Sequence, residues 1–216
     1  MKFTILKYIE NYKENLKQVW DSLDHEKINQ VANELKSAWI DGRNLYLCGN
    51  GGSSANANHI ANDLLFGVNP EGKGLKVHSL CANSAINLCL ANDIGYENIF
   101  SHQLQTLAKK GDILITLSGS GNSPNIINAL KKAQVIGLKS IALLGFDGGN
   151  AIKLSDITIH FKINDMQIAE DFQMIIFHLL VFQLSFSLLM KQVYLLSEMK
   201  TLDQEFLLII RMLVLP

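Results

Sequence analysis

The chain has 216 residues, a formal net charge of −1, and 48% hydrophobic against 18% charged residues. This balance is typical of a globular protein with a sizeable core and argues against a disordered chain. A net charge so close to zero gives no electrostatic basis for binding nucleic acid or an anionic membrane. We therefore expect neither nucleic-acid nor membrane partners.

Residues 1–11 mix charged and polar side chains and lack the apolar segment of a signal peptide, so we expect a cytoplasmic protein. The most apolar stretch, 174–190, contains His178 and Gln183 and is shorter than the ~20 apolar residues that a membrane span needs. The three cysteines lie at unrelated spacings, which predicts reduced thiols rather than a metal site or disulfides.

Two amphipathic helices are predicted before the first strand. Apolar residues recur at helical spacing over 4–23 and again over 25–41, and Gly42 follows as a stop signal. Neither segment carries an obvious chemical motif. We expect residues 1–42 to form a helical pair that packs on the core or on neighbouring subunits.

From Asn44 onward, strand-like apolar runs alternate with helical patterns. This alternation predicts an α/β domain over residues 43–192, with a five-stranded parallel sheet flanked by helices in a flavodoxin- or Rossmann-like three-layer sandwich. Residues 193–216 are an apolar tail to which the sequence assigns no role. The predicted strands are 44–48, 75–80, 112–117, 139–144 and 156–161, and the predicted helices are 53–66, 83–91, 97–109, 123–136 and 166–190.

Glycine and serine dominate two loops, Gly49 to Ser54 and Ser118 to Ser123, and each joins a predicted strand to a predicted helix. Free backbone N–H groups, hydroxyls and a helix N-terminus together favour an anion. Parallel sheets bind ligands at the carboxyl ends of their strands, so the loops predict a site for a small phosphorylated molecule. Neither loop has a dinucleotide or P-loop spacing, so we expect no nucleotide cofactor. The candidate phosphate-binding residues are Asn50, Gly51, Gly52, Ser53, Ser118, Gly119, Ser120, Asn122 and Ser123.

Four further residues are candidates for acid–base or metal chemistry. His59 and Asp63 are four residues apart on the helix after the first loop, so they share one helix face. Glu170 and His178 are eight residues apart on the last helix, which separates their Cα atoms by ~12 Å. Taken alone, each pair fits a structural role as well as a functional one.

In combination, these motifs resemble a known family. The segments Leu47 to Ser54 and Leu117 to Asn125 look like the sugar isomerase (SIS) domain. The segments Ala91 to Phe100 and Leu144 to Gly149 narrow the resemblance to the phosphoheptose isomerase branch, over roughly residues 5–190. Members of that branch convert sedoheptulose 7-phosphate into D-glycero-D-manno-heptose 7-phosphate for surface polysaccharide or lipopolysaccharide.

The resemblance implies roles for the four candidates. The family's catalytic acid–base pair falls on Asp63 and His178, and several members bind zinc at the positions of His59, Asp63, Glu170 and His178. This chain departs from the family pattern by carrying Asp63 in place of glutamate and Glu170 in place of glutamine. The resemblance also implies a homotetramer with sites at subunit interfaces. Asp93 is expected either to bind sugar hydroxyls or to act as a cap or turn residue. Glu170 is also a candidate substrate-binding residue.

Ketose–aldose isomerisation moves a proton between adjacent carbons through an enediol, and a carboxylate and an imidazole can share this work. We expect Asp63 to be the base and His178 the acid. A zinc ion that polarises the carbonyl and a metal-free pair both remain open. The alternative is a non-catalytic SIS protein that binds a sugar phosphate or a partner such as the bacterial replication initiator. A relative of that class lacks the carboxylate at the position of Asp63, so its presence here favours the enzyme.

Overall fold

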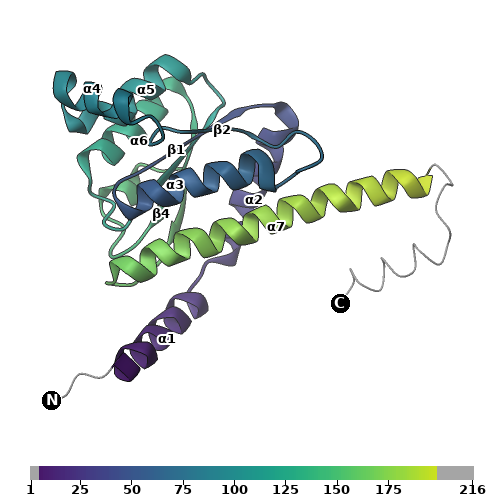
Figure 1. The fold of residues 1–216 in the computed structure, drawn as a ribbon, viewed down its shortest axis with the longest axis horizontal. Helices are drawn as coiled ribbons and strands as arrows, with labels where there is room; N and C mark the ends of the chain where they lie inside the picture. Colours follow the sequence, from purple (N-terminus) through teal and green to yellow (C-terminus); the bar gives the residue numbers. More distant parts are fainter. Residues whose placement is uncertain (1–4, 199–216) are drawn as a thin grey trace.

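The computed structural model describes residues 5–198 (Figure 1). At its centre lies a five-stranded parallel sheet with the strand order β2-β1-β3-β4-β5, which confirms the predicted fold class. The strands are β1 Asn44–Gly49, β2 Lys76–Ser79, β3 Ile113–Ser118, β4 Lys139–Leu144 and β5 Ile157–His160. The α-helices are α1 Ile5–Asp21, α2 His25–Asp41, α3 Gly52–Asn62, α4 Ser84–Ile94, α5 Ile99–Leu107, α6 Pro124–Ile136 and α7 Met166–Glu198.

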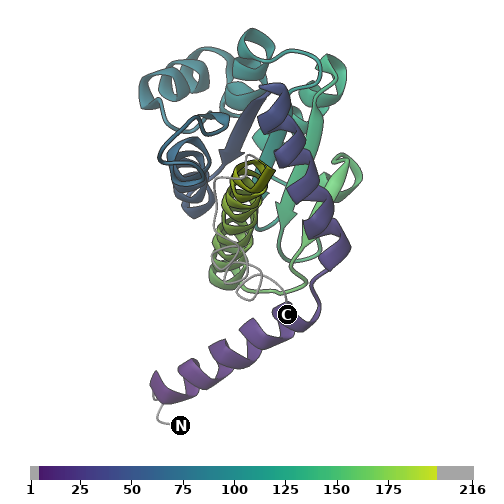
Figure 2. The ribbon, with the colours of Figure 1, turned by 90° about the vertical axis from the view of Figure 1, so that its right-hand side faces the viewer.

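Helices cover both faces of the sheet, and each face has its own apolar core. Residues of α2, α3 and α7 pack against one face, with Leu35, Ile60 and Phe172 among the buried side chains. Residues of α5 and α6 pack against the other face, where Phe100 and Leu130 are buried. The view in Figure 2 shows α2 and α7 running along the same side of the sheet. A sheet covered on both faces explains why its strands read as nearly continuous apolar runs.

The order in which strands are added to the sheet changes side at β1. Strand β2 is added on one side of β1, whereas β3, β4 and β5 are added in succession on the other. Ligands of open parallel sheets bind at such a switch point, outside the carboxyl ends of the strands. Both glycine- and serine-rich loops begin here, because one follows β1 and the other follows β3.

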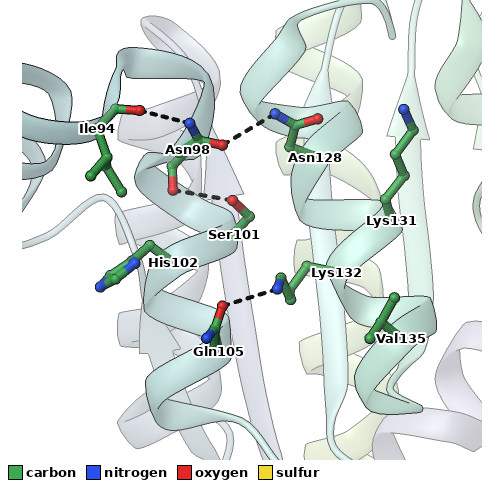
Figure 3. Close-up of a pocket in the computed structure, with 9 residues that line it drawn as sticks. All are labelled: Ile94, Asn98, Ser101, His102, Gln105, Asn128, Lys131, Lys132 and Val135. Atoms are coloured by element: carbon green, nitrogen blue, oxygen red, sulfur yellow. Dashed lines mark hydrogen bonds between the residues drawn. The ribbon is translucent and has the colours of Figure 1, made fainter.

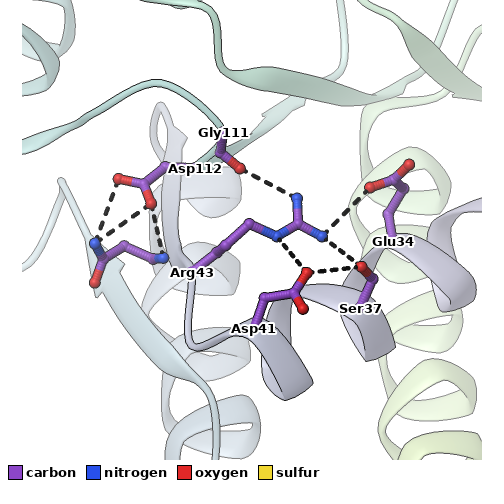
Figure 4. Close-up of polar contacts among 7 residues, drawn as sticks. Glu34, Ser37, Asp41, Arg43, Gly111 and Asp112 are labelled. Carbon is purple, nitrogen blue, oxygen red and sulfur yellow. Dashed lines mark hydrogen bonds and ion pairs between the residues drawn. The ribbon is translucent and has the colours of Figure 1, made fainter.

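A polar network joins the end of α2 to the start of the sheet (Figure 4). Gly42 adopts a left-handed conformation with φ +64°, which ends α2 and directs the chain into β1. The Arg43 guanidinium donates to the Gly111 carbonyl at 3.1 Å and lies 3.4 Å from the Asp41 carboxylate. Asp112 accepts from the Asn44 backbone N–H at 3.0 Å. These contacts bind the predicted helical pair to the sheet through α2.

Helix α1 projects away from the sheet (Figure 1). Its buried residue is Val19, near its C-terminal end, and the Tyr12 hydroxyl donates to the Asp171 carboxylate on α7. Burial and this carboxylate raise the pKa of Tyr12 to about 12. Much of the rest of the helix is exposed, including Ile5, Leu6 and Ile9. The α1 helix therefore presents an apolar surface that the described fold does not bury.

Helix α7 is longer than the predicted 166–190 and continues through 198, so it takes in the first residues of the predicted tail. Residues 199–216, with the rest of that tail, lie outside the described residues. By length and composition alone, α7 meets the criterion for a membrane span, because Met166–Tyr194 contains an 18-residue window with a mean hydropathy of 1.9. The expectation drawn from the shorter stretch 174–190 is therefore not confirmed. Core helices of soluble proteins meet the same criterion, and α7 buries Phe172, Phe177 and Leu180 against the sheet layer.

The predicted helix over 53–66 is in fact two elements. The α-helix α3 ends at Asn62, and Asp63–Gly67 forms a π-helical turn. The Asp63 carbonyl accepts from Val68 N–H at 2.8 Å, which closes the wider ring of that turn. Such π-turns are rare and occur frequently at functional sites. Here the turn begins at one of the candidate catalytic residues.

Candidate active site

The two glycine- and serine-rich loops meet over the carboxyl ends of β1 and β3 and enclose a cavity of about 250 Å³. Predicted binding residues from both loops line it, together with the candidate Glu170 and two residues that were not predicted, Leu117 and Met166. The lining residues are Asn50, Gly51, Gly52, Ser53, Leu117, Ser118, Gly119, Ser120, Ser123, Met166 and Glu170.

The cavity has the features of an anion site on its loop side. Helices α3 and α6 begin at Gly52 and Pro124, directly after the two loops, so the positive ends of both helix dipoles lie at the loops. The Ser118 hydroxyl accepts from Gly121 N–H at 3.0 Å, which fixes the second turn. A phosphate group would find preorganised donors here without a lysine.

Glu170 brings a negative charge into the same cavity. The Ser53 hydroxyl donates to the Glu170 carboxylate at 3.4 Å. A Cβ atom built on Gly52 would lie 2.2 Å from Glu170 Oε2, so only glycine lets the carboxylate approach the loop backbone this closely. Glu170 was a candidate for both substrate and metal binding, and its carboxylate lies with the first loop.

Amide side chains hold the loops together, and two of them, Asn125 and Gln173, were not among the predicted site residues. Asn50 and Asn125 exchange hydrogen bonds of 2.9 and 2.8 Å, which join the first loop to the start of α6. The Tyr96 hydroxyl donates to Asn50 at 2.8 Å. Buried Gln173 donates to Ser53 at 3.1 Å from α7. Gln173 could have been found from its position three residues after Glu170, on the same helix face.

Two predicted binding residues do not line this cavity. Asn122 accepts from the Asn150 backbone N–H at 2.9 Å and so attaches the second loop to the segment after β4. Asp93 lies on α4, where its carboxylate accepts from Asn92 at 2.8 Å. The hydrogen bond and charge of that carboxylate also raise the pKa of the neighbouring Cys89 thiol.

His59, Asp63 and His178 form a second cluster, built where α3 ends beside α7. His59 Nε2 lies 3.4 Å and His178 Nε2 lies 3.7 Å from Asp63 Oδ2. The two imidazole rings are tilted by 60° with centroids 5.4 Å apart. About half of each histidine side chain is exposed, whereas the Asp63 side chain is 22% exposed. The cluster therefore faces solvent, with its carboxylate held between two imidazoles.

The cluster fits a divalent metal such as zinc. One potential ligand atom from each of the three residues lies within 4.8 Å of the others. Two imidazole nitrogens and one carboxylate are a ligand set of catalytic zinc sites, which keep a fourth position open for water or substrate. Glu170, the fourth predicted ligand, is not part of this group of three.

The cluster and the loop cavity are separated along the two helices that carry them. His59 follows Ser53 by six residues on α3, a rise of ~9 Å, and His178 follows Glu170 by eight residues on α7, a rise of ~12 Å. Backbone chains extend by about 1.2 Å per bond, so the eight bonds from C1 to the phosphorus of a seven-carbon sugar 7-phosphate span ~10 Å. One such molecule can reach from the loops to the cluster.

The comparison with family models matches residues 7–145 to the SIS domain. A phosphoheptose isomerase from Aliarcobacter butzleri is 39% identical over 167 residues, which cover 76% of this chain and 87% of that protein. A phosphoheptose isomerase from Helicobacter pylori strain P12 is 36% identical, over 78% of this chain and 88% of the relative.

The chain belongs to the phosphoheptose isomerase family. Solved structures of the family share its fold. A phosphoheptose isomerase from Francisella tularensis superposes with a TM-score of 0.79 at 27% identity, over 84% of this chain and 96% of that one. One from Neisseria gonorrhoeae gives 0.77 at 25% identity, over 83% and 96%. The resemblance to phosphoheptose isomerases that the loop motifs indicated is thus confirmed along most of the chain.

Proposed function

We propose that this phosphoheptose isomerase interconverts sedoheptulose 7-phosphate and D-glycero-D-manno-heptose 7-phosphate through an enediol. The observation that carries the proposal is the spacing of two sites, the loop cavity of about 250 Å³ and an acid–base cluster ~9–12 Å further along α3 and α7. In an extended seven-carbon sugar 7-phosphate, C1 lies ~10 Å from the phosphorus, which matches this separation.

The loops would hold the phosphate, and Asp63 and His178 would move the protons. Asp63 takes a proton from C1 of the ketose, the proton on its carboxyl exchanges with solvent, and Asp63 then gives a proton to C2, which converts the ketose to the aldose by way of the enediol. His178 gives a proton to the C2 carbonyl oxygen and takes one from the C1 hydroxyl. The 3.7 Å between His178 Nε2 and Asp63 Oδ2 allows both groups to act on two adjacent carbons. Binding of the remote phosphate fixes the reacting carbons between them.

We further propose that His59, Asp63 and His178 hold zinc. A bound zinc ion would polarise the sugar carbonyl and stabilise the negative charge of the enediolate. The support is the ligand set itself, two imidazoles and a carboxylate within mutual reach. In this proposal Glu170 is not a zinc ligand, because its side chain lines the loop cavity.

The remaining parts of the function follow from the family. A homotetramer with sites at subunit interfaces is supported by the apolar residues exposed on α1 and α7, among them Leu6, Ile9 and Phe182. A cytoplasmic location and a role in supplying heptose for surface polysaccharide or lipopolysaccharide are part of the same proposal.

The experiment is incubation of the purified protein with sedoheptulose 7-phosphate, with added zinc and with a chelator, followed by NMR detection of the aldose. We expect the aldose product in the first condition and a slower reaction in the second. Binding of the sugar phosphate without conversion in either condition would favour the non-catalytic alternative. Equal rates with zinc and with chelator would contradict the zinc proposal alone.

A further inference from the structure

A second polar cavity lies on the opposite face of the sheet from α3 and α7, between α5 and α6. It has a volume of about 380 Å³. Figure 3 shows its side chains projecting from two helices that lie side by side. We call it the α5–α6 groove. Its lining residues are Ile94, Asn98, Ser101, His102, Gln105, Asn128, Lys131, Lys132 and Val135.

The groove follows from matching periodicity on its two walls. Asn98, Ser101 and Gln105 recur at spacings of three and four residues along one wall, and Asn128, Lys131 and Val135 do the same along α6. Residues at these spacings share one helix face. Apolar residues of both helices, such as Leu104 and Leu130, are buried beneath them. The solvent-facing seam between the two helices is therefore lined mainly by polar groups over a packed floor.

Hydrogen bonds within the protein hold several of the polar lining residues in place. Asn128 donates to the Glu97 carbonyl at 3.0 Å, and Asn98 donates to the Ile94 carbonyl at 2.7 Å. The Ser101 hydroxyl donates to the Asn98 carbonyl at 3.2 Å. These donors are used within the protein, so they shape the groove and leave ligand binding to other groups.

The other polar groups that line the groove, Lys131, Lys132 and His102, favour a negatively charged ligand. Lys132 is half-buried, and Gln105 accepts its hydrogen bond at 3.0 Å, which positions the ammonium group. Lys131 and His102 are drawn without a dashed contact in Figure 3. None of the described residues that line the groove is acidic. The groove therefore has two lysines on its α6 wall and an imidazole on its α5 wall, and its described lining residues include no carboxylate to neutralise them.

We propose that the α5–α6 groove is a second binding site, for the phosphate group of a small metabolite. Lys131 and Lys132 form charge-assisted hydrogen bonds to the phosphate oxygens, and His102 and the Gln105 amide add further donors. Apolar Ile94 and Val135 flank the organic part of the ligand. The cavity holds a molecule of metabolite size, and the net charge of −1 over the whole chain argues against an extended polyanion.

The test uses the full-length protein with methyl-labelled isoleucine, leucine, valine and methionine, titrated with glycerol 3-phosphate at constant ionic strength. Ile94 and Val135 report on the groove, whereas Leu117 and Met166 report on the loop cavity. The two sites are therefore read separately in one spectrum. We expect saturating shifts at Ile94 and Val135 at millimolar ligand.

The double variant Lys131→Met, Lys132→Met should weaken the titration at Ile94 and Val135 by about tenfold or more and leave that at Leu117 and Met166 unchanged. The control variant Lys153→Met, Lys162→Met removes the same charge from exposed positions outside the groove and should titrate like the wild type. Shifts confined to Leu117 and Met166 in the wild type would overturn the proposal. An equal loss at the groove in both double variants would also overturn it, because the effect would then be net charge.

Discussion

At the scale of single residues, substrate binding and proton transfer are assigned to different places, the loop cavity and the His59–Asp63–His178 cluster. The loop cavity has helix N-termini and serine hydroxyls but no lysine or arginine among its described lining residues. The His59–Asp63–His178 cluster brings together a carboxylate and two imidazoles, which are the side chains used for general acid–base catalysis. This division predicts that substitutions in one cluster change a different kinetic constant from substitutions in the other.

Asp63→Asn should lower kcat by about 10²- to 10⁴-fold, because an amide cannot accept the C1 proton. KM for sedoheptulose 7-phosphate should change little, since the phosphate is bound by the loops. Steady-state kinetics checks both constants. Glu71→Gln is the matched control, because it removes an exposed carboxylate near the same π-turn. A variant with kcat close to that of the wild type would show that Asp63 is not the base.

Glu170→Gln should strengthen the binding of inorganic phosphate by about tenfold, because it removes a like charge from the cavity. Isothermal titration calorimetry measures the change. Asp171→Asn removes the same charge from the next position of α7, where the carboxylate contacts Tyr12 instead, and should leave phosphate affinity unchanged. Equal affinities for wild type and Glu170→Gln would mean that this carboxylate does not act on the bound anion.

At the scale of elements, the geometry of the second loop determines the cavity. Gly121 has φ +64°, and a Cβ atom there would lie 2.1 Å from the Gly148 carbonyl oxygen. Its own carbonyl accepts from Ala151 N–H at 3.0 Å. The loop is thus packed against the segment after β4, and its shape depends on a position where a side chain has no room.

Gly121→Ala should lower the free energy of unfolding by ~2–3 kcal/mol and weaken phosphate binding, since the loop must move to relieve the contact. Gly111→Ala is the control, with φ +90° and nothing within 4 Å of the added Cβ. Its cost should be ~1 kcal/mol, from backbone strain alone, with phosphate binding intact. Urea unfolding and calorimetry compare the two. Equal costs would contradict the role given to the Gly148 contact.

The sequence predicts elements and loops well here because both depend on local pattern. Apolar runs separated by amphipathic helices specify a covered parallel sheet, and the loop residues Gly51 to Ser53 line the cavity. The direction of the Glu170 side chain depends on how α7 packs on α3, which no local pattern contains. The Asn50–Asn125 pair likewise joins residues 75 positions apart. The π-turn at Asp63 was missed because its residues fit a continuous helix equally well.

At the scale of the whole molecule, the described fold leaves apolar surface exposed on its long helices. Ile5 and Ile9 lie along one face of α1 and are each more than half exposed. A helix that projects from the sheet with such a face is typical of one that packs against another subunit. The proposed tetramer gives this surface a partner.

Ile9→Lys should therefore reduce the mass of the assembly, because it places a charge in the contact. Size-exclusion chromatography with light scattering measures that mass. Asn11→Lys adds the same charge to an exposed position two residues away and should leave the assembly intact. If Ile9→Lys keeps the wild-type mass, or if the wild type is a monomer, α1 is not the contact surface.

The central claim is that Asp63 moves a proton between C1 and C2 of a sugar phosphate anchored by the two loops. The most direct measurement is ¹H NMR of sedoheptulose 7-phosphate incubated with the protein in deuterated water. The account predicts aldose 7-phosphate carrying deuterium at C2, and loss of both conversion and exchange in Asp63→Asn. Conversion and exchange that persist in Asp63→Asn, or a wild type that shows neither, would contradict it.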